Sequence, residues 1–419
     1  MDVLTIITVL IITSAAFSYF NQRFIKLPGT IGIMTISVVV SLLILIIGTI
    51  GNKKSSIILE LAHNVDFSTV LLDILLGFLL FASALHFDYR KLKAQRMPVF
   101  FLSTVGVLVS ASIFGALLYG VSSLLKIDLP LIYCFIFGAL ISPTDPIAVG
   151  SILKKSRIPT RLETIISGES LFNDGVGLVL FIALSTIPNP EVKTLSFLES
   201  LQLFAREVFG GIAIGLVMGF IGYRLIKSIR DFQTIFLISL AIVLGISVVA
   251  RVFHASIPLA AVSAGLVIGN QSFDKHHPAH KYLSRVWQLL DEVLNTILFV
   301  LIGLQLVLMP FLDRYWLIGI LSIIIILIAR MASVSLPALF LLRRISFGNL
   351  SILTWAGLRG GISIAMALSL PHTQYREVIL ASCYFIVIFS IIVQGLTLNK
   401  VVENAVGKTA PRIPSPTKS

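Results

Sequence analysis

Apolar residues in this chain occur in long runs that short polar segments separate. A helix that crosses a membrane needs about 20 apolar residues, and runs of roughly this length recur along nearly the whole chain. The pattern therefore predicts an all-α polytopic membrane protein with about thirteen transmembrane helices, at residues 3–20, 31–50, 69–86, 97–125, 131–153, 163–186, 204–228, 234–252, 257–270, 287–307, 315–342, 350–370 and 377–399. The ninth range is short and carries Gly265 and Gly269 four residues apart, a spacing typical of closely packed membrane helices.

Composition supports a membrane protein and changes the meaning of the charge. Hydrophobic residues make up 57% of the chain and charged residues 12%, whereas soluble domains are about 25% charged. A net charge of +12 would suggest nucleic acid in a soluble protein. Here the basic residues lie in short loops between apolar runs, so we expect no nucleic-acid partner and a contact with anionic lipids of the inner leaflet instead.

The distribution of basic residues predicts how the chain is oriented. Twenty-two of the 32 lysines and arginines fall in the odd-numbered loops and the C-terminal segment, and eight fall on the other side. Cytoplasmic loops carry the excess of basic residues, so we expect a protein of the cell (inner) membrane with its N-terminus outside and its C-terminus inside. The proline-containing segment 400–419 is predicted to be a short disordered cytoplasmic tail.

The most informative polar residues lie in the stretch GESLFNDGVGLVLF, residues 168–181. At about 100° per residue, Glu169 and Asn173 share one helix face, and Ser170 and Asp174 lie beside them. Polar groups in a membrane helix face protein or water rather than lipid, and they mark ion and proton pathways. Carboxyl groups at mid-depth therefore predict an ion or proton site in this helix.

Two of the predicted helices are interrupted. The fifth, 131–153, contains Ser-Pro-Thr-Asp-Pro at 142–146, and the twelfth, 350–370, contains Ala-Gly-Leu-Arg-Gly-Gly at 356–361. Prolines and glycines weaken a helix locally, and these two helices run in opposite directions. This arrangement predicts inverted repeats in which two broken helices cross at the midplane. At the crossing, Asp145 would offset the positive helix ends and Arg359 the negative ones.

Among the charged residues predicted at mid-depth, the acids outnumber the bases by one. The deep acids are Asp145, Glu169 and Asp174, and the deep bases are Arg330 and Arg359. Glu169 and Arg330 are predicted to form a structural ion pair, because either charge alone would be costly to bury. Asp174 lies nearest the middle of the membrane and needs a proton or a metal cation. A carboxylate that either of two cations neutralises has the outline of a competitive exchanger.

Four segments together resemble a known family. ALISPTDPIAVG, GESLFNDGVGLVLF, PLAAVSAGLVIGN and AGLRGGISIAMALSLP are similar to motifs of the monovalent cation:proton antiporter family, in the branch of bacterial Na⁺/H⁺ antiporters and eukaryotic sodium–proton exchangers. The resemblance extends from the third span to the thirteenth. It implies a homodimer in which an ion-transporting core (97–187 and 315–399) moves like an elevator against a scaffold and dimerisation domain (1–96 and 188–314).

The resemblance also implies roles for single residues. Asp174 would bind Na⁺ or a proton, with Ser170 and the main chain of Thr144 as further Na⁺ ligands. Asn173 would hold the unwound helix, and Asp145 would act behind the ligands in the crossing. Glu169 and Arg330 match the family's ion pair, and Arg359 matches the arginine of its second broken helix. An Asn-Asp pair resembles the electroneutral branch, which exchanges one Na⁺ for one H⁺.

One position departs from the family, and some alternatives stay open. Some archaeal members carry a glutamate on the third helix, where this chain has Phe-Ala-Ser-Ala at 81–84. Exchange of K⁺ or Li⁺ for H⁺ is an alternative, because oxygen ligands suit these ions as well as Na⁺. A cation channel is an alternative of another class. Ser170 beside Glu169 is the only faint sign of an enzyme, so we expect no enzymatic activity and no cofactor apart from the transported ions.

Overall fold

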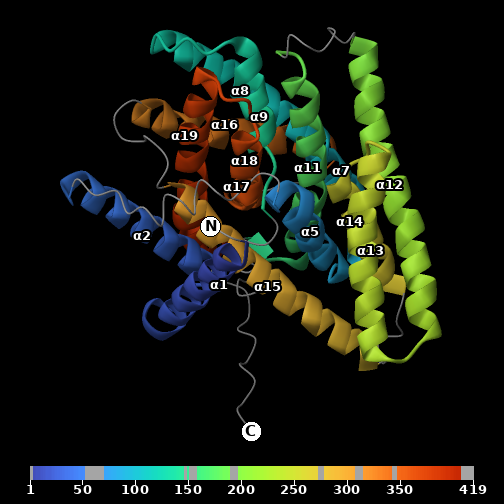
Figure 1. The fold of residues 1–419 in the computed structure, drawn as a ribbon. Coiled ribbons are helices and arrows are strands. Elements are labelled where there is room, and N and C mark those ends of the chain that lie inside the picture. The colour runs from blue at the N-terminus through green and yellow to red at the C-terminus, as the bar shows by residue number, and fades with distance from the viewer. Residues whose placement is uncertain are drawn as a thin grey trace.

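A computed structural model describes residues 3–51, 70–145, 149–150, 158–188, 197–271, 278–306, 315–341 and 347–406. Every regular element in these ranges is a helix, and the helices form one bundle (Figure 1). Eight of them are long and apolar enough to cross a membrane, and four shorter apolar helices accompany them. The all-helical class is therefore confirmed, while the number of thirteen spans stays a prediction.

The helices follow the apolar runs of the sequence closely. Their bounds are α1 (Val3–Phe20), α2 (Gly29–Gly51), α5 (Leu76–Leu85), α6 (Tyr89–Ala94), α7 (Arg96–Ser103), α8 (Val105–Leu124), α9 (Leu131–Ile141), α11 (Thr160–Ser185), α12 (Phe197–Ser228), α13 (Phe232–Val252), α14 (Ile257–Gln271), α15 (Pro278–Leu306), α16 (Trp316–Leu341), α17 (Phe347–Trp355), α18 (Gly361–Leu368), α19 (Gln374–Ile388) and α20 (Gly395–Val406). Three π-helical turns adjoin them: η1 (Asn21–Ile25), η2 (Val70–Leu75) and η3 (Phe389–Gln394).

The backbone of helix α14 lies very close to the backbones of two neighbouring helices. A Cβ atom added at Gly215 of α12 would lie 2.2 Å from the carbonyl oxygen of Ala260 in α14. A Cβ atom added at Gly269 of α14 would likewise lie 2.2 Å from the carbonyl oxygen of Leu85 in α5. Only glycine permits such an approach, which is how small residues serve membrane helix packing. The spacing of Gly265 and Gly269 thus reflects close packing, as expected.

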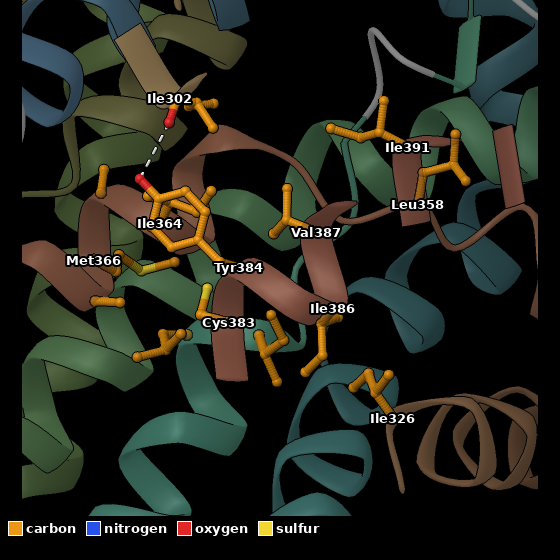
Figure 2. Packing of buried hydrophobic residues seen from close by; sticks show 14 of the residues in the cluster. Ile302, Ile326, Leu358, Ile364, Met366, Cys383, Tyr384, Ile386, Val387 and Ile391 are labelled. Carbon is orange, nitrogen blue, oxygen red and sulfur yellow. Dashed lines mark hydrogen bonds between the residues drawn. The ribbon is translucent and has the colours of Figure 1, made fainter. Parts of the chain in front are cut away.

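The bundle has two sides that one long helix connects. Helices α12, α13 and α14 lie together on one side, and α8, α9, α16 and α19 pack together on the other (Figure 1). Helix α15 runs diagonally across the bundle and reaches α18 (Figure 1). There the buried Tyr384 of α19 donates a hydrogen bond of 3.2 Å to the carbonyl oxygen of Ile302 in α15 (Figure 2). The two sides are therefore joined through a closely packed hydrophobic core.

The C-terminal end of the last helix corrects one prediction. Residues 400–406 were assigned to a disordered tail, but they continue α20 to Val406. Leu398 and Val402, four residues apart, are both fully buried, and α20 packs against α17. An apolar face at helical spacing stabilises the extra turns. Residues 407–419 lie outside the described ranges.

Candidate functional site

Asp174 lies near the middle of α11 and is completely enclosed. Its exposed fraction is 1%, so the side chain contacts neither lipid nor open solvent. Its Oδ2 atom has no hydrogen-bond partner among the residues that the structure describes. An ionised carboxylate without a partner is very costly at such a position. A proton or a cation at this atom would remove that cost.

Ser170 and Asn173, which lie close to Asp174 in the sequence of α11, form a hydrogen-bonded group with Thr144 from the segment after α9. The Asn173 side chain holds Thr144 twice: Oδ1 accepts from the Thr144 N–H at 3.3 Å, and Nδ2 donates to Thr144 Oγ1 at 2.8 Å. Thr144 Oγ1 also lies 2.7 Å from Ser170 Oγ. All three side chains are buried. Both polar atoms of the Asn173 amide thus bind the non-helical segment after α9, and the hydroxyl groups of Thr144 and Ser170 lie close together.

Arg359 lies at the carboxyl end of α9. This helix ends at Ile141, and residues 143–145 are not helical. Arg359 is 2% exposed, and its Nη1 donates to the carbonyl oxygens of Ser142 at 2.5 Å and Pro143 at 2.9 Å. These carbonyl groups have lost their helical partners and carry partial negative charge. The guanidinium group therefore satisfies the end of this helix.

Asp145 lies at the amino end of α18. Its backbone N–H donates to the carbonyl oxygen of Leu358 at 2.8 Å. Gly360 precedes α18, and a Cβ atom added there would lie 2.3 Å from Asp145 Oδ2. A carboxylate at this position complements the partial positive charge of a helix N-terminus. The segments 142–145 and 356–360 thus contact each other with opposite charges on opposite helix ends.

Glu169 and Arg330 join α11 to α16. Arg330 Nη1 donates to Glu169 Oε1, and Nη2 donates to Oε2 at 2.8 Å, so the pair is bidentate. Nη2 also donates to the carbonyl oxygen of Leu353 at 3.3 Å. Glu169 is 1% exposed and Arg330 5%. The guanidinium group of Arg330 is therefore bound to Glu169.

Two cavities lie at opposite ends of α11. The first, which we call the acidic cavity, has a volume of about 340 Å³ and includes Glu163, Ser167 and Leu171 in its wall. The second, of about 310 Å³, includes Leu178 and Ile182 together with Glu207, Arg251 and His254. At a rise of about 1.5 Å per residue, Asp174 lies only ~5 Å beyond Leu171 and ~6 Å before Leu178 along the helix axis. Asp174 therefore lies within about one helical turn of residues that line each cavity.

Comparison with known proteins identifies the family. Residues 9–404 match the family model described as "Sodium/hydrogen exchanger, transmembrane". The chain belongs to this family. It is 39% identical to the Na(+)/H(+) antiporter NhaP of Pseudomonas aeruginosa over 414 residues, which cover 96% of each chain. It is 31% identical to the Na(+)/H(+) antiporter NhaH of Halobacillus dabanensis, over 80% of this chain and 83% of that one.

The fold of this exchanger-family member also has a solved counterpart. The sodium proton antiporter MjNhaP1 from Methanocaldococcus jannaschii, solved at pH 8, superposes with a TM-score of 0.78 at 19% sequence identity. The match covers 97% of this chain and all of that one. At this identity the likeness concerns the fold alone. The resemblance that the motifs indicated is confirmed.

Sequence reasoning missed the residues that hold the second interrupted segment. The Arg359 backbone N–H donates to Ser390 Oγ at 2.8 Å, and Ser390 Oγ donates to Gln394 Oε1 at 2.6 Å. Gln394 Nε2 in turn donates to the carbonyl oxygen of Trp355 at 3.4 Å. Ser390 and Gln394 lie four residues apart in an otherwise apolar run. That spacing was the available signal, because buried polar groups in a membrane helix need partners.

The third-helix stretch holds no acid, and it adjoins the acidic cavity. Ser83 lines that cavity. Ala82 and Ala84 on either side of it are completely buried in α5. A carboxylate from this helix is therefore absent from the stretch 81–84, as the sequence already indicated. The ligands proposed below come from α11 and from the segment that follows α9.

Gly177 fixes the distance between α11 and the segment after α9. A Cβ atom added at Gly177 would lie 2.1 Å from Pro143 Cγ. We expect Gly177→Ala to lower stability by about 1–3 kcal/mol, because the proline ring has to move and carries Thr144 with it. The measurement is thermal unfolding of the purified protein in detergent.

Gly120 of α8 provides the matched control, because a Cβ atom added there meets no atom within 4 Å. Gly120→Ala should leave stability unchanged or raise it by up to about 1 kcal/mol, since alanine is the better helix former. Equal unfolding temperatures for the two alanine variants would contradict the packing argument.

Proposed function

We propose that this chain is an electroneutral Na⁺/H⁺ antiporter in which a cation and a proton compete for the Asp174 carboxylate. The observation that carries the proposal is the position of this group: it is buried, its Oδ2 lacks a partner among the described residues, and a cavity lies beyond each end of the adjoining helix segment. A single buried charge accepts one positive occupant at a time. The relatives of this chain are named as antiporters rather than enzymes.

The neighbouring oxygen atoms suit a monovalent metal ion. Na⁺ would take Asp174, Ser170 Oγ and the main-chain oxygen of Thr144 as ligands, and water would complete the shell. Asn173 holds Thr144 through two hydrogen bonds, so it positions this segment and is not itself a ligand. When a proton binds instead, the carboxyl group becomes neutral and the ion leaves. One carboxylate thus exchanges one Na⁺ for one H⁺.

The transport movement is proposed from the packing of the two sides of the bundle. In this proposal the core, 97–187 and 315–399, moves like an elevator against the scaffold, 1–96 and 188–314. The two interrupted segments support an inverted repeat, because each places a charged side chain at a helix end of the other. At the boundary, Gly175 of α11 faces Leu259 of α14, where an added Cβ atom would lie 2.5 Å away. A small residue on one side and an aliphatic residue on the other favour sliding at this contact, while the hydrogen bond from Tyr384 to Ile302 crosses the boundary elsewhere and would have to break.

The same proposal includes the setting of the protein. It places the chain in the cell membrane as a homodimer, with its N-terminus outside and its C-terminus in the cytoplasm, as the basic residues predict. The acidic cavity would then open toward the cytoplasm, because its residues come from the predicted inner ends of α2, α5, α11 and α15. The second cavity would belong to the outer side.

The function is tested by reconstitution into liposomes that contain a pH-sensitive dye. Pulses of NaCl, LiCl and KCl at equal ionic strength should each be compared with choline chloride. A signal for NaCl supports the proposal, and a signal for KCl alone would replace it with K⁺/H⁺ exchange. Ion flux without any coupled proton movement would favour a cation channel instead.

Electroneutral exchange predicts that the membrane potential does not drive transport. Since one positive charge moves in each direction, a K⁺ diffusion potential of either sign should leave the initial rate of Na⁺-dependent proton flux unchanged. The measurement uses the same liposomes with valinomycin and a K⁺ gradient, and a protonophore added at low concentration checks the dye response. A rate that rises with an inside-negative potential and falls with the opposite one would contradict the one-for-one ratio.

A further inference from the structure

The acidic cavity has a charge opposite to that of the chain as a whole. Its wall includes four acidic residues, Asp88, Glu163, Asp291 and Glu292, with Lys91 as the basic residue and His86 beside it. The chain itself carries a net charge of +12. A cleft lined by one sign of charge raises the local concentration of the opposite ion. This field favours cations, but acidic residues alone do not define where a cation would stop.

The wall formed by α15 has a more specific arrangement of carboxylates. Gln288 Nε2 donates to Glu292 Oε1 at 3.2 Å. Asn295 Nδ2 donates to Asp291 Oδ1 at 3.1 Å and to the Asp291 main-chain carbonyl at 2.7 Å. All four residues line the acidic cavity. Each carboxylate is thus positioned by a neutral amide four residues away.

Asn295 provides evidence for a cation at this wall that is independent of the acidic residues. Its exposed fraction is 1%, and its Oδ1 has no hydrogen-bond partner among the described residues. The orientation of the amide follows from chemistry, because both atoms that Nδ2 contacts are acceptors and only the NH₂ group can donate to them. A buried carbonyl oxygen without a donor is destabilising. A cation bound directly to this oxygen would satisfy it.

We propose that Asp291 and Asn295 of α15 form a second binding site for a monovalent cation, in which the ion is held on its way between the cytoplasm and Asp174. This inference rests on the proposed function and deepens it. The acidic cavity extends along α11 from Glu163 past Ser167 to Leu171. From there Asp174 is one helical turn away, so a cation released at Leu171 has about 5 Å left to travel along the helix axis.

The donor set explains why the ion would be monovalent and loosely held. Among the described residues, no group of three or more His, Cys, Asp or Glu side chains is arranged to hold a metal ion. Divalent ions need several such ligands. One carboxylate and one amide oxygen, with water for the rest, suit Na⁺ or Li⁺ at high concentration and release it readily. Weak, hydrated binding is what a waiting position on a transport path requires.

Binding is tested without relying on transport. The protein carrying Asp174→Asn loses the proposed main site, so any remaining Na⁺ binding reports on the second site. The ²³Na linewidth in detergent solution detects weak binding in fast exchange. We expect broadening above a micelle blank in Asp174→Asn, its displacement by LiCl but not by choline chloride, and its loss in the double variants with Asp291→Asn or Asn295→Leu. The double variant with Glu403→Gln, an exposed acid near the C-terminal end of α20, should keep the broadening.

Transport kinetics provide the second test. Asp291→Asn should raise the KM for Na⁺ about tenfold, the lower end of the effect of a charged cleft, while kcat stays unchanged because the chemistry at Asp174 is intact. Asp291→Glu should restore the KM and shows that the fold tolerates a change there. Glu403→Gln should leave both constants unchanged.

The two proposals fail in different ways. An unchanged KM in Asp291→Asn together with no broadening in Asp174→Asn would overturn the second site and leave the main site standing. Equal loss of broadening with Asp291→Asn and with Glu403→Gln would reduce the effect to general surface charge, which also overturns it. Na⁺/H⁺ exchange by Asp174→Asn would instead overturn the proposed main site.

Discussion

Asp174→Asn is expected to abolish proton exchange for Na⁺, Li⁺ and K⁺ alike. Asparagine has nearly the same shape as aspartate, but it is neutral and does not exchange one positive occupant for another. The Asp174 side chain is 1% exposed, and its Oδ2 has no hydrogen-bond partner among the described residues. Arg330 forms its ion pair with Glu169. We expect the dye signal in proteoliposomes to fall to that of empty liposomes for every salt pulse.

The same variant should fold normally, which separates loss of the site from loss of the protein. Because a buried carboxylate without a partner is costly, its replacement by a neutral amide should leave the unfolding temperature equal or higher. Asp128→Asn serves as the control, since Asp128 is an exposed acid in the segment between α8 and α9. It should keep full exchange. Residual exchange above background in Asp174→Asn, with any cation, would show that another group carries the ion.

Arg330→Ala is expected to lower the free energy of unfolding more than any other substitution proposed for this chain. Removing one partner of a buried ion pair leaves the other charge uncompensated, at a cost of about 3–5 kcal/mol. Glu169 would keep its charge at 1% exposure, and the contact of Arg330 with the Leu353 carbonyl oxygen would be lost as well. We expect a lower yield of monodisperse protein and a lower unfolding temperature in detergent.

Two further variants separate the ion pair from the mere presence of an arginine. Arg230→Ala removes an exposed arginine in the segment between α12 and α13 and should change the unfolding temperature little. Glu169→Gln with Arg330→Met removes both charges and should recover part of the loss, because a buried pair is replaced more cheaply than it is broken. A normal unfolding temperature for Arg330→Ala would contradict a structural role for the pair.

Several elements of this protein could be predicted from the sequence because the membrane makes strict demands on it. Long apolar runs specify helices, so α11 and α13 begin and end within a few residues of their expected bounds. The motif 168–181 specifies a membrane helix with acids at its centre. The last helix was harder to bound, because the apolar positions Leu398 and Val402 continue into a segment whose polar and proline residues are typical of a tail.

Other parts of the site were beyond a reading along the chain. Ser390 and Gln394 belong to the thirteenth predicted span, yet they hold the segment 356–360 of the twelfth. Gly177 looked like one small residue among many, and its contact with Pro143 depends on how two helices meet. The acidic cavity gathers residues from Thr30 to Asn295. Tertiary packing determines which of these distant residues become neighbours, and their positions in the sequence do not predict these contacts.

The sequence by itself determined that the chain is a helical membrane protein of the exchanger family with more acid than base at mid-depth, because hydrophobicity and charge count are properties of the residues in order. Only the tertiary structure decided which groups the two buried arginines bind. Arg330 reaches Glu169 across 161 residues of sequence, and Arg359 is occupied by the carbonyl groups at the end of α9. Hydrogen bonds and ion pairs act over a few ångströms, so the folded positions of the arginines, and not their number, decide which buried groups they bind.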